Sequence, residues 1–332
     1  MATAGVGVAA AAAFAAGAAA GPPLFAQSAT TIDDVLALDR PVVLAHTGGE
    51  DEFPGSTMYA FARSMEAGVD VLDLNVVLTA DGVLAVQHDL DVDRQTNGTG
   101  SVGAMTFAAL HELDNAYWFT GTCGVCHDEP AESYRYRGMR TGVVPSPQGY
   151  TPDDFAIPRL DELMDAFPDI PLGIEIKAEG ADGRATADAL VDLLEARGRI
   201  DHVVVSSFSD DVIAYVEAIA PDLEVSPGPG PIGAFLLEGT PLPDGQRILQ
   251  LPPEFADVPL LTPDYIAAAH EAGYVIWVWP DDHDLENQDA YRDFLVDGID
   301  GLNINYPAAG VAAVAEFVTT ACPRAARATR WG

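Results

Sequence analysis

The stretch that most limits how this chain folds is residues 42–100. It contains three short runs rich in Val, Leu and Ala. Each run carries polar or titratable side chains at or near its end: His46 in the first, Asp73 and Asn75 in the second, and His88 in the third. Residues 56–68 have apolar side chains at helical spacing and end at a glycine. Strand, helix, strand, with reactive groups at the strand ends, is how a parallel α/β barrel presents a site.

The rest of the chain continues this alternation. Candidate strands, separated by amphipathic helices, are residues 171–177, 202–208, 223–228, 274–280 and 299–307. Residues 247–253 could add an extra strand within a second insertion. About eight rounds of strand and helix predict an α/β fold of the TIM (β/α)8 barrel type. A doubly wound dinucleotide-binding sheet would need a glycine-rich turn after its first strand, and the sequence has none there.

One long segment lacks any period. Residues 120–156 are rich in Gly, Pro, Tyr and Arg, and such a segment inside a compact domain is functional or disordered. Because it contains several aromatic residues and a cysteine pair, we expect an ordered insertion after the third strand that covers one edge of the site. The chain is then one barrel domain over residues 29–332, preceded by residues 1–28.

Residues 1–28 and the cysteines bear on the compartment. The first segment is mostly Ala, Gly and Val and ends in an Ala-x-Ser sequence, which is typical of a signal peptide; a retained anchor or an Ala-rich tail is the alternative. We therefore expect an exported protein, extracellular or in the cell envelope. In such a chain Cys123 and Cys126 favour a local disulfide over a zinc site, which would need further ligands. Cys322 is left unpaired.

The charge excludes some partners. Asp and Glu number 51 against 16 Lys and Arg, a formal net charge of −35. This argues against nucleic-acid binding and against stable docking on anionic membranes, because both need a basic face. Lys177 is the only lysine in the chain. Glu50, Asp51 and Glu52 could recruit a cation, but we expect them to face solvent. We expect no special role for the five histidines other than His46 and His88.

The motifs, taken in order, resemble those of the glycerophosphodiester phosphodiesterases. That family has His-Arg-Gly, Pro-Glu-Asn-Thr, Gly-Ala-Asp, Glu-x-Asp, Thr-x-Asp-Gly, His-Asp and Arg-Thr-Thr-x-Gly-x-Gly. The matching stretches are His46-Thr47-Gly48, Pro54-Gly55-Ser56-Thr57, Gly68-Val69-Asp70, Asp73-Leu74-Asn75, Thr79-Ala80-Asp81-Gly82, His88-Asp89 and Arg94-Gln95-Thr96-Asn97-Gly98-Thr99-Gly100. Later matches are residues 174–177, 206–208, 277–280 and 301–307. The resemblance covers most of the chain from residue 40 to residue 310.

The resemblance implies a phosphodiester hydrolase with two catalytic histidines, His46 and His88. A neutral imidazole accepts a proton and an imidazolium donates one near neutral pH, so the two can act on opposite sides of one phosphorus. The family places its metal on the positions of Asp73, Asn75 and Glu175. Their oxygens suit a divalent metal, Ca²⁺ or Mg²⁺, which would neutralise charge on the phosphodiester.

The phosphate contacts depart from the family pattern. The family Arg that would hold the phosphate is Thr47, the Glu of Pro-Glu-Asn-Thr is Gly55, and one metal-site Asp is Asn75. Lys177 matches the family Lys and remains a cationic phosphate contact, with the Thr47 hydroxyl as a neutral one. Trp277 and Trp279 are candidates for an apolar wall that contacts the substrate alcohol, or they are core residues.

These observations predict an enzyme that hydrolyses a small or lipid-derived glycerophosphodiester to an alcohol and a glycerol phosphate. One alternative is a lysophospholipase D-type enzyme, which a long apolar groove near the Trp residues would favour. The other is a catalytically weak barrel that binds a ligand, which the departures at positions 47, 55 and 75 would favour. The oligomeric state is not predictable from the sequence.

Overall fold

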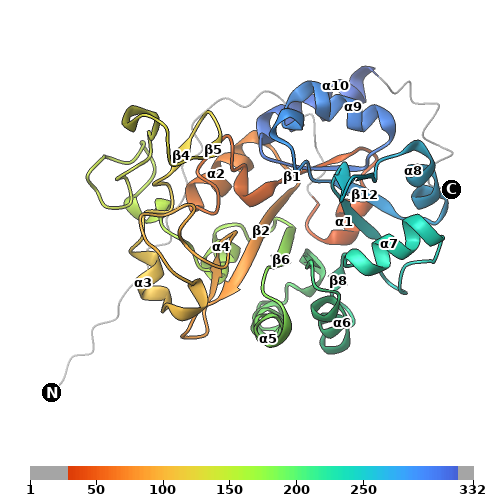
Figure 1. The fold of residues 1–332 in the computed structure, drawn as a ribbon, viewed down its shortest axis with the longest axis horizontal. Coiled ribbons are helices and arrows are strands. Elements are labelled where there is room, and N and C mark those ends of the chain that lie inside the picture. The colour runs from red at the N-terminus through yellow and green to blue at the C-terminus, as the bar shows by residue number, and fades with distance from the viewer. Residues whose placement is uncertain (1–28, 321–332) are drawn as a thin grey trace.

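Eight parallel strands form the inner layer of the fold (Figure 1). The computed structural model describes residues 29–320. The strands are β1 (Val42–Ala45), β2 (Val71–Leu78), β6 (Leu172–Ile176), β7 (Val203–Ser206), β8 (Glu224–Val225), β9 (Ile248–Leu251), β12 (Val275–Val278) and β13 (Gly301–Ile304). Their hydrogen-bonded order runs β8-β7-β6-β2-β1-β13-β12-β9, and the Ser226 hydroxyl donates to the Ile248 carbonyl at 3.0 Å across the remaining seam. The sheet is therefore a nearly closed TIM-type barrel, which confirms the predicted fold class.

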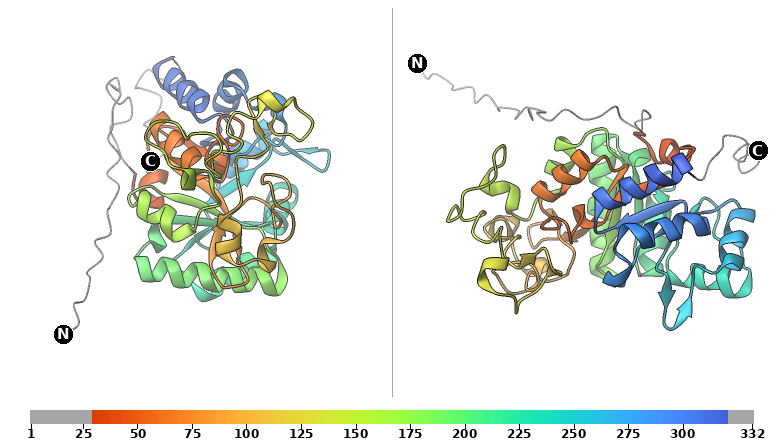
Figure 2. Two further views of the ribbon diagram at one scale, coloured as in Figure 1. Left: turned by 90° about the vertical axis from the view of Figure 1, so that its left-hand side faces the viewer. Right: turned by 90° about the horizontal axis from the view of Figure 1, so that it is seen from above.

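Helices cover the outside of this barrel (Figures 1 and 2). They are α2 (Met58–Ala67), α4 (Leu160–Ala166), α5 (Gly180–Arg197), α6 (Asp210–Ile219), α7 (Pro229–Glu238), α8 (Pro263–Glu271), α9 (Gln288–Asp297) and α10 (Pro307–Thr320). Local signals fix their ends: the Thr57 side chain caps the first turn of α2, and Gly68 ends it with φ of 93°. The sequence had predicted neither α7 nor α10.

Alternation along the strands divides the barrel interior into layers. On β2, Leu72 and Leu74 face the helices, whereas Val71, Asp73 and Asn75 point inward. Val71 belongs to an apolar cluster with α1 (Ile32–Leu36), which lies below the barrel. The polar side chains therefore rest on an apolar plug and open at the carboxyl ends of the strands, where barrel enzymes hold their sites.

Two strand predictions need correction. The third run folds as β3 (Leu84–Val86), which pairs antiparallel with β2 and is not one of the eight parallel strands. The segment predicted as an extra strand in an insertion contains β9, which pairs in parallel with β12 and belongs to the barrel. Both errors arise because a short apolar run does not reveal the direction of its partner.

The irregular segment after β3 is ordered and packs on the barrel. It follows α3 (Phe107–His111) and begins at β4 (Phe119–Thr120), which pairs with β5 (Gly124–Val125). Its aromatic residues Tyr136 and Phe155 join a buried cluster with Tyr59 of α2. Within residues 29–320, no helix is long and apolar enough to cross a membrane. The predicted signal segment and Cys322 lie outside the described residues.

Candidate active site

His46 and His88 face one another at the carboxyl end of the barrel. Their ring centroids are 5.7 Å apart, the rings stand nearly perpendicular, and both line a cavity of about 650 Å³. His46 follows β1, and His88 follows β3, whose pairing with β2 brings it across the mouth. The structure thus brings together the two histidines that the sequence singled out.

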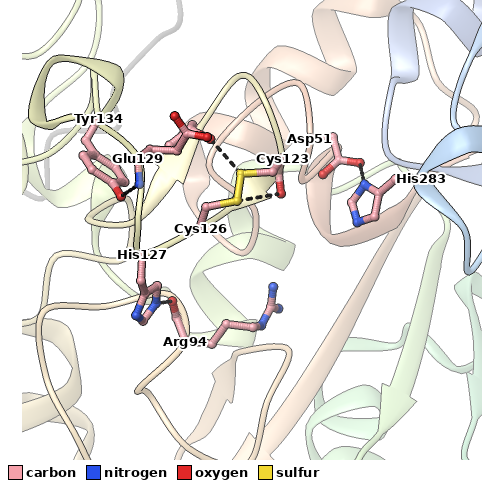
Figure 3. The surroundings of a disulfide bond; sticks show 9 residues. Asp51, Arg94, Cys123, Cys126, His127, Glu129, Tyr134 and His283 are labelled. Atoms are coloured by element: carbon pink, nitrogen blue, oxygen red, sulfur yellow. Dashed lines mark hydrogen bonds and ion pairs between the residues drawn. A yellow bond between two sulfur atoms is a disulfide. The ribbon is translucent and has the colours of Figure 1, made fainter.

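A relay of side chains fixes the ring of His46. Asn305, just after β13, donates its amide N–H to Asp51 Oδ2 at 3.0 Å, so its Oδ1 faces His46 Nδ1 at 2.7 Å. An amide oxygen only accepts, so the proton of His46 lies on Nδ1 and Nε2 is free for the cavity. His283 Nδ1 approaches Asp51 Oδ2 at 2.9 Å from the other side (Figure 3).

His88 is fixed by a carboxylate and an arginine. Its Nδ1 donates to Asp89 Oδ1 at 2.6 Å, and Arg94 Nε donates to Asp89 Oδ2 at 2.6 Å. Arg94 also lies 3.7 Å from Glu50, which in turn lies 3.7 Å from His46 Nδ1. A chain of charged contacts through Asp89, Arg94 and Glu50 therefore connects the two histidines.

These surroundings shift the pKa values of the two histidines in opposite directions. Burial lowers the pKa of His46, but the carboxylates of Glu50 and Asp73 and the bond to Asn305 outweigh it and leave the pKa raised. Burial lowers the pKa of His88 and prevails over the bond to Asp89. A pair of titratable groups with separated pKa values is the arrangement expected of an acid and a base.

The three predicted metal ligands lie side by side. Asn75 and Glu175 are paired in register on β2 and β6, and Asp73 lies over Gly173, where any Cβ would come within 2.4 Å of its carboxylate. Asn75 Nδ2 donates to Glu175 Oε2 at 2.9 Å, and Lys177 Nζ approaches the same oxygen at 2.9 Å. Burial raises the pKa of Asp73 to about 6.

Two oxygens of this set suit a cation. Asn75 Oδ1 and Glu175 Oε1 are buried and have no hydrogen-bond partner. Such orphaned acceptors are costly unless something binds them, and oxygen ligands are those that Ca²⁺ and Mg²⁺ prefer. The set consists of two carboxylates and one amide, and residues 29–320 hold no cluster of three or more His, Cys, Asp or Glu side chains suited to a metal.

Of the two predicted phosphate contacts, one lines the cavity and the other does not. Lys177 lines the cavity and is the only Lys or Arg among its described lining residues. Thr47 is fully buried, has φ of 47°, and does not line the cavity; its hydroxyl lies 3.4 Å from Glu50 Oε2. The assignment of Thr47 to the phosphate is therefore wrong in this structure, because its side chain packs beneath the loop.

The departures at positions 47 and 55 are coupled in space. A Cβ on Gly55 would meet Thr47 Oγ1 at 2.8 Å and Glu50 Cβ at 2.7 Å. Glu50 and Thr47 thus occupy the space into which a side chain at position 55 would project. Glu50 and Asp51 are largely buried, which contradicts the expectation that they face solvent.

The two tryptophans of the β12 region occupy different layers. Trp277 is 1 % exposed, lies in the apolar plug beside Val275, and does not line the cavity. Trp279 lines the cavity. Both point inward because they are two residues apart, but two residues advance about 7 Å along a strand. Of the two tryptophans offered by the sequence as a wall for the substrate, Trp279 borders the cavity, and the assignment of Trp277 to the substrate is corrected to a core position.

Sequence reasoning missed several residues of this site. Glu50, Asp51, His283 and Asn305 all contribute, and His283 had been set aside as ordinary. Asn305 lies two residues beyond Asn303 on the same inward face, and the Asn-x-Asn spacing at a strand end was a usable signal. Glu50, Asp51 and His283 lie on loops and had no periodic signal.

The insertion borders the same loop. A Cβ on Gly124 would come within 2.2 Å of Asp51 Oδ1, so β5 lies directly against that carboxylate. His127 contacts the Arg94 carbonyl at 2.8 Å, and Figure 3 draws Cys123 and Cys126 joined by a disulfide next to these residues. The insertion therefore supports the segment that holds the relay to His46.

Comparisons with known proteins agree with this geometry. The model of the glycerophosphoryl diester phosphodiesterase family matches residues 46–301. A glycerophosphodiester phosphodiesterase of Caldanaerobacter subterraneus is 30% identical over 188 residues, 56% of this chain and 65% of that protein. One of Bacillus subtilis is 26% identical over 208 residues, 59% of this chain and 62% of that protein. The matches thus span slightly less than two thirds of these relatives.

Solved structures share the fold. A glycerophosphodiester phosphodiesterase from Agrobacterium tumefaciens has a TM-score of 0.58 at 23% identity, covering 82% of this chain and 99% of that one. An Oleispira antarctica phosphodiesterase in complex with the product sn-glycerol-3-phosphate has a TM-score of 0.61 at 18% identity, covering 83% and 97%. These likenesses show the fold. The match of the family model to residues 46–301, more than half of the chain, shows that this chain belongs to the glycerophosphoryl diester phosphodiesterase family.

Proposed function

We propose that this protein hydrolyses a glycerophosphodiester to an alcohol and a glycerol phosphate. The observation that carries the proposal is the facing pair His46 and His88, each with Nδ1 engaged and Nε2 free at the cavity. One imidazole takes a proton from the attacking water, and the other gives a proton to the oxygen of the leaving alcohol. The bond between phosphorus and that oxygen breaks as the new P–O bond forms.

A divalent metal, Ca²⁺ or Mg²⁺, is part of this proposal. Asp73, Asn75 and Glu175 would hold it, since two of their oxygens are buried without a partner. When bound, the metal would supply positive charge to the phosphodiester oxygens. Lys177 adds the one lysine charge of the cavity, which matters because Glu50, Asp73, Glu175, Asp281 and Glu286 also line it.

We also propose that the protein is exported and that Cys123 and Cys126 pair in the mature form. The support is the composition of residues 1–28 and the juxtaposition of the two cysteines in the insertion.

The test is hydrolysis of glycerophosphocholine, glycerophosphoethanolamine and glycerophosphoglycerol with Ca²⁺, with Mg²⁺ and with a chelator. We expect turnover that the chelator removes and that His46→Ala lowers by about 10²–10⁴-fold. Calorimetry should show one divalent ion bound by the wild type and weaker binding by Glu175→Gln. A second candidate function is ligand binding without catalysis, and its support is that Thr47 replaces the family Arg. A folded protein that binds the substrates without turning over any of them would favour this second candidate.

A further inference from the structure

One short segment of the insertion, residues 123–127, lies against the supports of both histidines; we call it the cysteine loop. Near its start, the backbone of Gly124 approaches Asp51 so closely that a Cβ on the glycine would lie 2.2 Å from Asp51 Oδ1. Asp51 is buried and accepts from Asn305 the hydrogen bond that leaves the Asn305 oxygen facing His46. The missing side chain of Gly124 therefore lets the loop close over the relay to His46.

The far end of the cysteine loop contacts the segment that supports His88. His127 Nε2 donates to the Arg94 carbonyl at 2.8 Å, and the His127 ring stacks on Trp118 with the ring centroids 4.2 Å apart (Figure 3). The side chain of Arg94 binds Asp89, which accepts the hydrogen bond from His88. Because His127 is stacked on one side and bonded on the other, it fixes the backbone of residue 94. The loop thus touches the supports of both imidazoles.

Two cysteines lie within this loop. The Cα atoms of Cys123 and Cys126 are 6.2 Å apart, a distance that a disulfide spans, and Figure 3 draws the two sulfur atoms bonded. The residues are three positions apart, so the bridge closes a very short loop and removes little freedom from the unfolded chain. Its main effect is therefore local, on the backbone that lies against Asp51.

We propose that the cysteine loop is a positioning element for hydrolysis and that the disulfide between Cys123 and Cys126 switches it between a braced and a loose state. With the disulfide formed, the loop holds the supports of both histidines in place for proton transfer. A dithiol reductant converts the bridge to two thiols and is itself oxidised to a disulfide, with two electrons transferred. The loop then loosens, and both imidazoles lose part of their support. This inference rests on the proposed hydrolysis and on the proposed pairing of the two cysteines.

The switch links activity to compartment. Disulfides persist in oxidising compartments, whereas glutathione and thioredoxin keep thiols reduced in the cytoplasm. A chain that is exported, as we propose for this one, would have a loose loop and low activity during synthesis. It would reach full activity after export, when the bridge forms.

The first experiment measures hydrolysis of glycerophosphocholine with and without dithiothreitol. It compares wild type, the double variant Cys123→Ser with Cys126→Ser, and Cys322→Ser as the control. We expect the reductant to lower kcat of wild type and of Cys322→Ser by about tenfold, with KM within about twofold. The double variant should have the low kcat from the start and should not respond to the reductant. Full kcat in the double variant, or an equal response to the reductant in all three proteins, would overturn the switch.

Thermal unfolding shows whether the disulfide merely stabilises the fold. The loop that it closes is short, so the melting temperature of the double variant should fall by only a few degrees. A large fall in melting temperature, with KM raised as much as kcat is lowered, would assign the bridge to general stability and contradict a positioning role.

Two glycines give matched variants that leave the cysteines unchanged. Gly124 and Gly142 both lie in the insertion with positive φ, 65° and 71°, so alanine costs similar backbone strain at either position. Alanine at position 124 also meets the Asp51 carboxylate, whereas a Cβ at position 142 meets nothing within 4 Å. We expect Gly124→Ala to lower kcat by at least about tenfold and Gly142→Ala to leave it within about twofold. Equal kcat in the two variants would contradict the coupling of the loop to the relay.

Spectroscopy separates this inference from the proposed function. The imidazole C–H signals of His46 and His88 are assigned by NMR through His46→Ala and His88→Ala and are recorded in wild type with and without dithiothreitol. Both signals should move on reduction, whereas the signal of His202, which pairs with Asp201 on the surface, should not. Such movement supports the coupling even if no glycerophosphodiester is hydrolysed. Unchanged signals, in protein whose thiol count shows that the bridge is reduced, would overturn the inference.

Discussion

The two ends of the cavity are built in different ways. At the reactive end, the side chains of Asp73, Asn75 and Glu175 come from barrel strands, and hydrogen bonds or ion pairs hold His46 and His88. At the apolar end, the side chains come from α7, the hairpin of β10 (Glu254–Phe255) and β11 (Val258–Pro259), and segments that follow β7 and β12. The first end is polar and fixed, whereas the second is apolar and partly exposed.

The difference indicates that the two ends of the cavity have different functions. Directional bonds suit a task that needs fixed geometry, such as proton transfer to a particular oxygen. Apolar contact has no direction and scales with the apolar area that is buried, so it suits ligand groups of variable size. Barrels commonly keep chemistry at strand ends and vary specificity through loops. The predictions below test whether the two ends act separately, beginning with the largest effect.

His88→Ala should remove turnover and leave the apolar end intact. We expect a loss of about 10²–10⁴-fold in kcat, because no other group replaces the positioned imidazole. Initial rates and the binding of an alkylphosphocholine, a ligand with an apolar tail, would be measured on the same preparation. The control is His202→Ala, a histidine paired with Asp201 on the surface, which should retain activity within about twofold. Loss of ligand binding at the apolar end of the cavity in His88→Ala would contradict the separation of the two ends.

The two tryptophans should separate stability from binding. Trp277→Ala leaves a cavity in the apolar plug and should lower the free energy of unfolding by about 3–5 kcal/mol. Trp279→Ala should cost much less stability and should raise KM for the substrate, because Trp279 lines the cavity. Denaturant unfolding would measure the effect on stability, and steady-state kinetics would measure the effect on substrate binding. Equal destabilisation by both variants would argue against their placement in different layers.

Glu286 should make stability depend on pH. Burial raises its pKa to about 7 from an ordinary value of 4.5, and it accepts hydrogen bonds from the Tyr291 hydroxyl and from the backbone N–H of Asn305. The folded state therefore holds this proton more tightly than the unfolded state. The resulting stability is present in full below pH 4.5 and is lost as the pH rises through about 7, by roughly 3 kcal/mol at most.

The measurement is the melting temperature of Glu286→Gln between pH 5 and pH 8. The amide keeps an acceptor oxygen and removes the buried charge, so the variant should gain stability at pH 8 and gain little at pH 5. Asp293→Asn, which changes an exposed carboxylate on α9, serves as the control and should show no such trend. A uniform shift at every pH would point to packing as the cause.

Substitution of Asn305, and exchange of Asn305 with Asp51, should change the kcat that depends on His46. Asn305→Asp alone places two carboxylates about 3 Å apart, because Asn305 Nδ2 now donates to Asp51 at that distance. We expect kcat to fall by about tenfold with KM little changed. The double variant Asn305→Asp with Asp51→Asn restores one donor and one acceptor, so it should recover most of the loss.

The pH profile distinguishes positioning from a merely structural role. A carboxylate in direct contact with His46 Nδ1 favours the imidazolium, so the histidine limb of kcat should move to higher pH in the double variant. If neither variant alters kcat or its pH profile, Asn305 and Asp51 do not position His46.

The sequence could supply much of the reactive end and little of the apolar end. His46, Asp73, Asn75, His88 and Glu175 follow from the period of two along strands and from motif order. The order of strands followed from their alternation with helices. The direction of β3 and the place of β9 in the barrel did not follow, because a short apolar run does not show which strand it pairs with or in which direction.

The sequence by itself determined the barrel and the strand-end residues, since these depend on local periodicity. It also indicated the family, through the resemblance of its motifs and their order. Only the tertiary structure decided that Glu50 and Asp51 are buried beside His46, that Thr47 packs beneath the loop, and that Trp279 rather than Trp277 reaches the cavity. It also decided that Ile232 and Leu236 of α7 border the cavity as well as the core. The reason is that burial and contact depend on segments far apart in the chain, such as Asp51 and Asn305, which no local pattern relates.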